Sequence, residues 1–194
     1  MDAQVRDVLA ELETFGSEND EQQNDRSKKM LNLEPDAAQF MSILVRSHRA
    51  KRILEIGTSN GYSTIWLAWS AQFTGGQIIS LDRDADKHEM ADANLKRAGL
   101  REFVELRQGD ATELVAALEG TVDFVFFDAD RWTAPEQLRL LLPKLDPGAL
   151  VIADNVHSHP DQIAGYLQAI EDAFVFDHMV IAVGKGLSIA YKTS

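Results

Sequence analysis

The chain has 194 residues, of which 45% are hydrophobic and 26% are charged, and it contains no cysteine. Its 19 lysines and arginines and 31 aspartates and glutamates give a formal net charge of −12. These values are typical of one globular domain, and they exclude disulfides, thiolate zinc sites and iron–sulfur clusters. The negative charge also argues against nonspecific binding to nucleic acid or to an anionic membrane. Any bound metal ion must therefore be held by oxygen or imidazole ligands.

The first seven residues lack the cationic region and the apolar run of a signal peptide. No stretch of the chain approaches the roughly 18 consecutive apolar residues that a membrane span requires. We therefore expect a cytoplasmic protein with no membrane partner.

The N-terminal residues predict an amphipathic helix that Asp2 can cap. The residues that share its apolar face are Val5, Val8, Leu9 and Leu12. The next stretch, Gly16 to Lys29, is almost entirely polar and predicts a mobile loop. We therefore divide the chain into an N-terminal helix and polar loop, residues 1–30, and a main domain, residues 31–194.

A second helix is predicted from Pro35, because proline is favoured in the first helical turn. The residues that form one face of this helix are Ala37, Phe40, Met41, Leu44, Val45 and His48. After it, short apolar runs alternate with longer amphipathic ones. The runs that predict strands are residues 52–56, 77–82, 102–107, 122–128, 149–154, 174–182 and 187–192. The segments that predict helices are residues 63–72, 84–98, 111–118, 134–142 and 160–172.

Five strand–helix units in a row predict an α/β fold with a doubly wound, mostly parallel sheet of seven strands. The last two strands are joined by Gly184-Lys185-Gly186 and predict an antiparallel hairpin.

A glycine-containing loop follows the first predicted strand, with Gly57 and Gly61 between strand and helix. Glycine lets the backbone turn sharply there and lets a ligand approach closely. The second strand ends in Asp82, whose carboxylate can bind both hydroxyls of a ribose. Ser59 and Tyr62 occupy positions where a dinucleotide fingerprint requires glycine. The pattern therefore favours a nucleoside ligand without phosphates.

The third strand is followed by Gly109, Asp110 and Ala111, an acidic loop that could meet an adenine amino group. The ends of the next two strands carry further polar side chains, namely Asp128, Asp130, Asp154 and Asn155. Two carboxylates and an amide at one edge of a sheet suit Mg²⁺, Mn²⁺ or Ca²⁺. The alternative is that these acidic residues only cap the helices that follow.

The segments Leu54–Ser63, Phe126–Asp130 and Ala153–Val156 resemble the class I S-adenosylmethionine-dependent O-methyltransferases, in the form of the catechol and caffeoyl-CoA group. The resemblance extends from about Leu31 to the C-terminus and implies a Rossmann-like fold, a divalent cation and a homodimer. The residues that it assigns to the cofactor are Leu33, Glu55, Gly57, Thr58, Ser63, Asp82, Asp110, Ala111 and Asp128. The residues that it assigns to the metal ion are Asp128, Asp154 and Asn155, with Mg²⁺ as the expected ion.

Two positions depart from the pattern of this group. Arg131 stands where the group usually has a lysine that serves as general base, and arginine effectively cannot lose its proton. We therefore assign catalysis to Asp128 and Arg131, with the arginine acting electrostatically, unless Arg131 is a surface residue paired with Asp130. Met179 stands where animal catechol enzymes carry glutamate, which weakens catechol itself as the acceptor.

The expected activity is metal-assisted O-methylation of a small, phenolic acceptor with adjacent oxygens. One alternative is a tRNA hydroxyuridine O-methyltransferase, which the overall acidity disfavours but two short basic runs allow. A second alternative is a noncatalytic S-adenosylmethionine-binding protein that has lost its general base.

Overall fold

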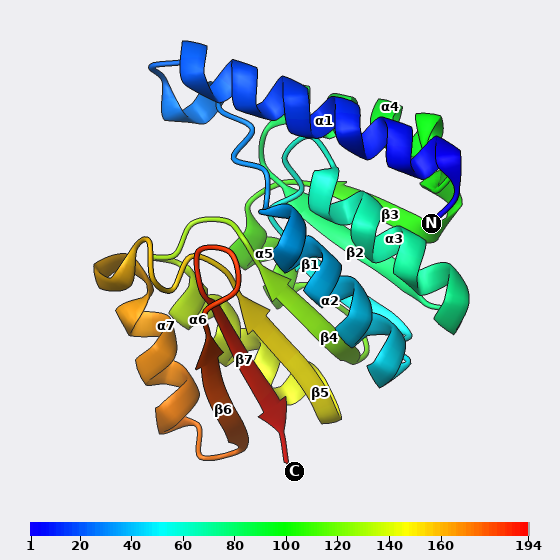
Figure 1. The fold of residues 1–194 in the computed structure, drawn as a ribbon. Coiled ribbons are helices and arrows are strands. Elements are labelled where there is room, and N and C mark those ends of the chain that lie inside the picture. Colours follow the sequence, from blue (N-terminus) through cyan, green and yellow to red (C-terminus); the bar gives the residue numbers. More distant parts are fainter. Residues whose placement is uncertain (194) are drawn as a thin grey trace.

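The computed structural model describes residues 1–193 and contains a seven-stranded sheet with helices on both faces (Figure 1). The strand order is β3-β2-β1-β4-β5-β7-β6. The strands are β1 (Arg52–Ile56), β2 (Gln77–Asp82), β3 (Val104–Gln108), β4 (Val122–Phe127), β5 (Leu145–Ala153), β6 (Phe176–Ile181) and β7 (Leu187–Lys192). The first five strands pair in parallel, whereas β7 is antiparallel to both β5 and β6. The predicted doubly wound sheet with a C-terminal antiparallel hairpin is confirmed.

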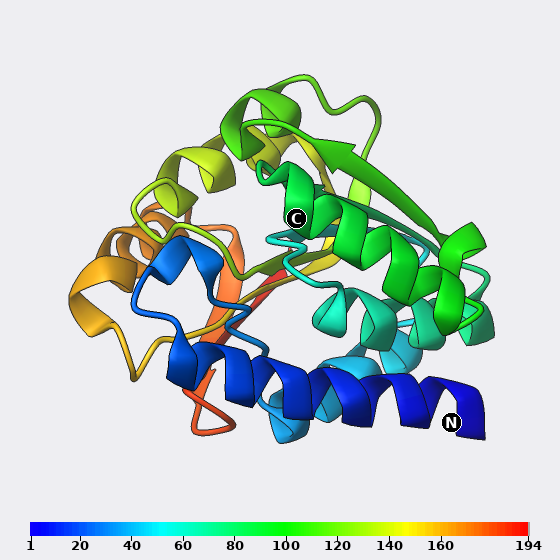
Figure 2. The ribbon, with the colours of Figure 1, turned by 90° about the horizontal axis from the view of Figure 1, so that it is seen from above.

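The helices form two layers around the sheet (Figure 2). The α-helices are α1 (Ala3–Gln22), α2 (Pro35–His48), α3 (Tyr62–Thr74), α4 (Ala85–Arg97), α5 (Ala111–Ala116), α6 (Ala134–Leu141) and α7 (Pro160–Asp172). Three short 3-10 turns are η1 (Arg26–Lys28), η2 (Arg101–Phe103) and η3 (Leu142–Lys144). The helices α1 to α4 share one apolar cluster with the sheet, and α5 to α7 share a second cluster on its other face. No helix in residues 1–193 is both long enough and apolar enough to cross a membrane.

The prediction of a mobile loop from Gly16 to Lys29 is wrong in its first half, because α1 continues to Gln22. The helix begins as predicted, with the Asp2 carboxylate accepting a hydrogen bond from the Val5 amide. Its second half is stabilised by polar contacts in place of an apolar face. Tyr62 donates a hydrogen bond to Glu13, and Asp20 accepts from the backbone amides of Met30 and Leu31. These hydrogen bonds to other segments stabilise the polar second half of α1 as a helix.

Several strand boundaries differ from the prediction for local reasons. β5 begins at Leu145, four residues before the predicted start at 149, although Pro147 and Gly148 read as a turn. Gly148 has a φ of 85°, and the pairing of β4 with β5 is irregular just there. The third strand starts at Val104 because residues 101–103 form a 3-10 turn. Phe174 lies outside β6 and is 92% exposed.

The carboxyl ends of the parallel strands lie at one edge of the sheet, where ligands bind in open α/β folds. Figure 1 shows the β6–β7 turn and the loop after β5 at this edge. The connection between α1 and α2, which contains η1, also crosses this edge (Figure 2). The fold therefore brings together segments from both ends of the chain.

Candidate active site

The loop between β1 and α3 depends on its two glycines. Gly57 has a φ of 111°, and a Cβ atom at this position would collide with the backbone carbonyl of Asp128. Gly61 has a φ of 87° and forms the N-cap of α3, and its Cβ would lie 3.1 Å from the Cα of Ala91 in α4. The loop therefore packs closely against two neighbouring segments and has the bare backbone that a ligand can approach.

Glu55 lies at the end of β1 and is completely buried. Its carboxylate accepts hydrogen bonds from the hydroxyls of Ser63 at 2.6 Å, Thr64 at 2.5 Å and Ser80 at 2.5 Å. Burial raises the pKa of Glu55 to about 7, although the three hydroxyls act in the opposite direction. Ionisation of Glu55 beside the glycine loop therefore costs free energy in the cofactor-free protein. A positively charged ligand bound nearby could offset this cost.

The other predicted cofactor residues near this loop have different surroundings. Thr58 is buried, and its hydroxyl lies 2.6 Å from that of Ser80, so its side chain points into the fold. The Asp82 carboxylate accepts from the backbone amides of Ser59, at 2.8 Å, and Asp84, at 3.0 Å. Asp82 is half-buried and is the last residue of β2, so these two hydrogen bonds fix the orientation of its carboxylate at the edge of the sheet.

Asp110 caps α5, accepting hydrogen bonds from the amides of Thr112 and Glu113, and its side chain is exposed. This is a helix-capping role, which the sequence did not predict for Asp110. Ala111 follows it and is half-buried. The Gly109 amide donates to the Asp82 carbonyl at 2.9 Å, which brings the loops after β2 and β3 side by side.

The segment before α2 lies over the glycine loop. Ser59 donates a hydrogen bond from its hydroxyl to the Met30 carbonyl at 2.7 Å, and Lys87 of α4 donates to the Lys29 carbonyl at 2.8 Å. Leu33 is 3% exposed and belongs to the apolar cluster on the α2 side of the sheet. The segment that contains Leu33, which the resemblance assigns to the cofactor, is thus in contact with the glycine loop through Met30.

The structure brings the three predicted metal ligands together. The Asn155 amide nitrogen lies 2.7 Å from an Asp154 carboxylate oxygen and 3.3 Å from one of Asp128. Asn155 has a φ of 69°, which turns the chain sharply after β5 and directs this side chain toward the end of β4. Both Asp154 and Asn155 are buried, and Asp128 is half-buried. In residues 1–193 no three carboxylate or imidazole side chains converge in a way that could hold a metal ion, so the amide is the third member here.

The electrostatics of this cluster favour a cation. Burial raises the pKa of Asp154 to about 6, and the charge of Glu34 adds to this effect. Burial and the neighbouring Asp154 raise the pKa of Asp128 well above its ordinary value, and the charge of Arg131 acts against that rise. One oxygen of Asp154 is buried without a hydrogen-bond partner, and the Asn155 N–H group lies between the two carboxylates. Since the Ser158 hydroxyl contacting the Asn155 oxygen can donate or accept, the amide can turn its oxygen inward, and the set fits a hard divalent ion.

Arg131 lies beside this cluster and lines a small cleft together with Asp128 and Asp154. Its Nη1 donates to the Gln162 side chain at 3.2 Å, whereas its Nε is buried and has no partner. The alternative pairing with Asp130 is not formed, because the Asp130 carboxylate accepts from the Trp132 amide instead. Arg131 is therefore a site residue by position, since it lines the same cleft as the acidic cluster.

Two further charged residues at the site are missing from the sequence prediction. Glu34, the residue before α2, forms an ion pair with Lys185 of the β6–β7 turn, with 2.5 Å between the charged atoms. One Glu34 oxygen is buried without a partner, and its charge reaches Asp154. These residues are 151 positions apart in the sequence (185 − 34), and only the tertiary structure brings them together. The two glycines around Lys185 were the one local signal that this turn approaches another segment closely.

Comparisons with known proteins agree on one family. A family model described as O-methyltransferase matches residues 3–188. The chain is 37% identical over 130 residues to a catechol O-methyltransferase of Niastella koreensis, covering 65% of this chain and 58% of the relative. It is 36% identical over 118 residues to a catechol O-methyltransferase of Mycobacterium tuberculosis, covering 60% of this chain and 53% of the relative. The matched segments therefore span only a little over half of these relatives.

Solved structures match over a larger share. An O-methyltransferase from Bacillus cereus in complex with SAH is 26% identical, with a TM-score of 0.80 over 96% of this chain and 91% of that one. The O-methyltransferase TomG from Streptomyces achromogenes, in complex with SAM, is 26% identical, with a TM-score of 0.79 over 100% of this chain and 91% of that one. Since the family model covers nearly all of the chain, the protein belongs to the O-methyltransferase family.

Proposed function

We propose that the protein transfers a methyl group from S-adenosylmethionine to one oxygen of a small acceptor with adjacent oxygens, with the help of a divalent cation. The observation that carries this proposal is the pair of carboxylates, Asp128 and Asp154, bridged by the Asn155 amide beside the glycine loop. The matched structures that hold SAM or SAH support the cofactor. The relatives that are catechol O-methyltransferases support a phenolic acceptor.

The proposed cofactor site uses the loops after β1, β2 and β3. Gly57 presents bare backbone to the methionine part, Glu55 supplies a nearby negative charge, and Asp82 presents acceptors for the ribose hydroxyls. Asp110 and Ala111 border the adenine. Leu33, Thr58 and Ser63 contribute backbone or packing contacts, since their side chains are buried. Asp128, whose carbonyl packs against Gly57, borders the cofactor beside the metal site.

Methyl transfer is an in-line displacement in which an acceptor oxygen bonds to the methyl carbon while the carbon–sulfur bond breaks, leaving its electron pair on sulfur. The cation, when bound by Asp128, Asp154 and Asn155, would lower the pKa of the acceptor hydroxyl and orient its two oxygens. Arg131 stays protonated at any working pH, so the acceptor proton leaves to solvent water before the methyl group is transferred. The positive charge of its guanidinium favours the oxyanion electrostatically from beside the acidic cluster, which leaves its buried, unpartnered Nε available to another group of the acceptor.

Calorimetry with S-adenosylmethionine, with and without Mg²⁺, followed by methyl-transfer assays on catechols, flavonoids and tRNA, tests this proposal. We expect cofactor binding in both cases, but turnover of a vicinal diol only with Mg²⁺, Mn²⁺ or Ca²⁺ present. Cofactor binding without turnover of any acceptor would support the noncatalytic alternative. Methylation of tRNA alone, with a steep salt dependence, would support the hydroxyuridine alternative.

We also propose that two copies associate through the sheet face beside α2. Ile43 of α2 is 47% exposed, Met179 of β6 is 58% exposed and Tyr191 of β7 is 45% exposed. The strand register places Met179 and Tyr191 on the face that α2 partly covers. Exposed apolar side chains that gather on one face are typical of an interface between subunits.

Sedimentation analysis checks this association. We expect a dimer for the wild-type protein and a monomer for Met179→Asp, because the substitution places a charge in the apolar interface. Phe73→Ser removes another exposed apolar side chain, on α3, and should leave the dimer intact. A monomeric wild-type protein at high concentration would refute the proposed interface.

A further inference from the structure

We propose that Arg26 and Arg131 together select acceptors that carry an anionic group, a carboxylate or a phosphate, away from the reacting oxygens. This inference rests on the proposed O-methyltransferase function, and it names the class of acceptor. It is carried by two guanidinium groups at the mouth of the site that have no acidic partner within residues 1–193.

Arg131 is held in place but its charge is not neutralised. It lines the cleft with Asp128 and Asp154, and its hydrogen bond to Gln162 is to a neutral oxygen. Its Nε is buried and unpartnered, which is costly for a charged donor unless a ligand supplies the acceptor. The guanidinium fork matches the two oxygens of a carboxylate or phosphate better than a lysine ammonium does.

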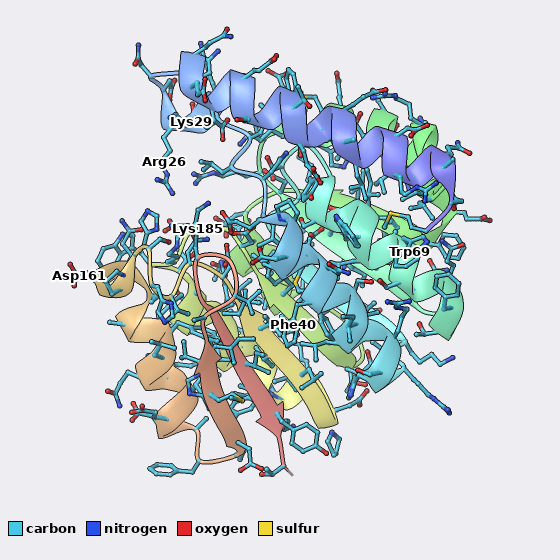
Figure 3. The ribbon with its side chains drawn as sticks, viewed as in Figure 1. Arg26, Lys29, Phe40, Trp69, Asp161 and Lys185 are labelled. Atoms are coloured by element: carbon cyan, nitrogen blue, oxygen red, sulfur yellow. The ribbon has the colours of Figure 1, made fainter. Side chains whose placement is uncertain are left out.

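Arg26 approaches the same opening from the other end of the chain. It lies in η1, is exposed, and its side chain extends from η1 toward the part of the molecule that carries Lys185 (Figure 3). Asp25 is not its partner, because that carboxylate accepts from the amide and hydroxyl of Ser27.

The charge of Arg26 reaches the site. The pKa of Arg131 is lowered chiefly by burial, and the positive charge of Arg26 lowers it further. Partial burial likewise lowers the pKa of His159, and the charges of Arg131, Arg26 and Lys185 all act in the same direction. The positive charges of Arg26, Arg131 and Lys185 therefore lie close enough together to act on His159.

The charges of Asp128, Asp154 and Asp130 act on Arg131, but neither arginine forms an ion pair within residues 1–193. Lys185 is paired with Glu34, and a divalent ion would offset the charges of Asp128 and Asp154. The exposed acids nearby, Asp130 and Asp161, form no ion pair with either arginine in the described chain. In a chain with a net charge of −12, this local positive excess favours an anionic acceptor.

The test compares two acceptors that share the same adjacent hydroxyls, 3,4-dihydroxybenzoate and the neutral 4-methylcatechol. For the wild-type protein we expect kcat/KM for the benzoate to exceed that for 4-methylcatechol roughly tenfold at low salt. The difference should shrink toward 1 M salt, where the Debye length falls to about 3 Å. Calorimetry on the SAH-loaded protein measures the same preference as affinity, without requiring turnover.

Arg26→Gln should remove most of this preference, about fivefold, by raising KM for the benzoate while leaving 4-methylcatechol unchanged. Arg139→Gln, which makes the same charge change on the exposed side of α6, should leave the preference intact. Arg131→Lys keeps the charge but removes the fork, so it should raise KM for the benzoate more than for the neutral acceptor.

Equal kcat/KM values and affinities for the two acceptors, or a preference that survives Arg26→Gln, would overturn the inference and leave the proposed methyl transfer untouched. If the benzoate binds preferentially but neither acceptor is methylated with any divalent ion, the anionic selectivity stands and the proposed reaction fails for this class of acceptor.

Discussion

Replacing Asp154 with asparagine should reduce divalent-dependent methyl transfer about a thousandfold while the protein still folds and still binds S-adenosylmethionine. The substitution removes one of the two negative charges that would hold the cation. It also replaces the buried, unpartnered carboxylate oxygen with a neutral amide that binds hard cations weakly. Turnover with saturating acceptor and Mg²⁺, together with Mg²⁺ affinity from calorimetry, measures the effect.

The variant is also expected to be more stable than the wild-type protein in the absence of a cation. The pKa of Asp154 is raised to about 6 in the folded protein, so its ionised form opposes folding at neutral pH. Asparagine removes that unfavourable charge and keeps an oxygen that can accept from Asn155. A higher melting temperature together with lost turnover would separate a functional defect from a folding defect.

Asp130→Asn is the matched control for this prediction. Asp130 lies on the neighbouring loop, is exposed, and accepts from the Trp132 amide, which an asparagine oxygen can also do. We expect its turnover to stay close to the wild-type value. Full activity of Asp154→Asn with Mg²⁺ would exclude this residue as a ligand, and equal losses in both variants would point to general electrostatics.

The sequence was informative about this site because parallel strands end at a common edge. Asp82 is the last residue of β2, and Asp128 and Asp154 directly follow β4 and β5, so the predicted strand ends alone place these residues at the same edge of the sheet. The left-handed backbone of Asn155 brings its amide between two of these carboxylates. Periodicity and strand order were sufficient for this part of the architecture.

Other parts of the site depend on contacts between distant segments. Glu34, Lys185 and Arg26 come from a helix start, a hairpin turn and a 3-10 turn, and apart from the glycines around Lys185 their local sequence does not indicate that they approach the strand ends. The prediction of a loop from Gly16 fails in the second half of α1 for the same reason. Its stabilising partners, the Tyr62 hydroxyl and the backbone amides of Met30 and Leu31, belong to other elements.

Glu55 provides the second large expected effect, on cofactor binding and its pH dependence. Its pKa of about 7 in the free protein means that the group is substantially protonated below pH 7. A cationic cofactor beside it favours the carboxylate, so affinity for S-adenosylmethionine should rise with pH and level off above pH 7. Binding below pH 7 should release a proton, which calorimetry in buffers of different ionisation enthalpy detects.

Glu55→Gln should weaken cofactor binding roughly 100-fold at pH 8 and abolish this pH dependence, because the amide carries no charge to offer the cofactor. Glu105→Gln is the control, since Glu105 is an exposed carboxylate on β3 that pairs with Arg107. An unchanged affinity in Glu55→Gln at pH 8 would remove Glu55 from the cofactor site.

Although Glu55→Gln should weaken cofactor binding, we expect it to stabilise the cofactor-free protein at high pH. The folded pKa of Glu55 lies above its ordinary value of 4.5, so the folded state binds more protons than the unfolded state between about pH 4.5 and 7. Its contribution to stability is therefore greatest at low pH and is lost as the pH rises through 7, by an amount on the order of 3 kcal/mol. Denaturant unfolding at pH 5 and pH 8 should show this loss in the wild-type protein and a smaller one in Glu55→Gln. The variant would thus fold more stably at pH 8 while binding its cofactor less tightly, a combination expected only if the buried charge is kept for the ligand.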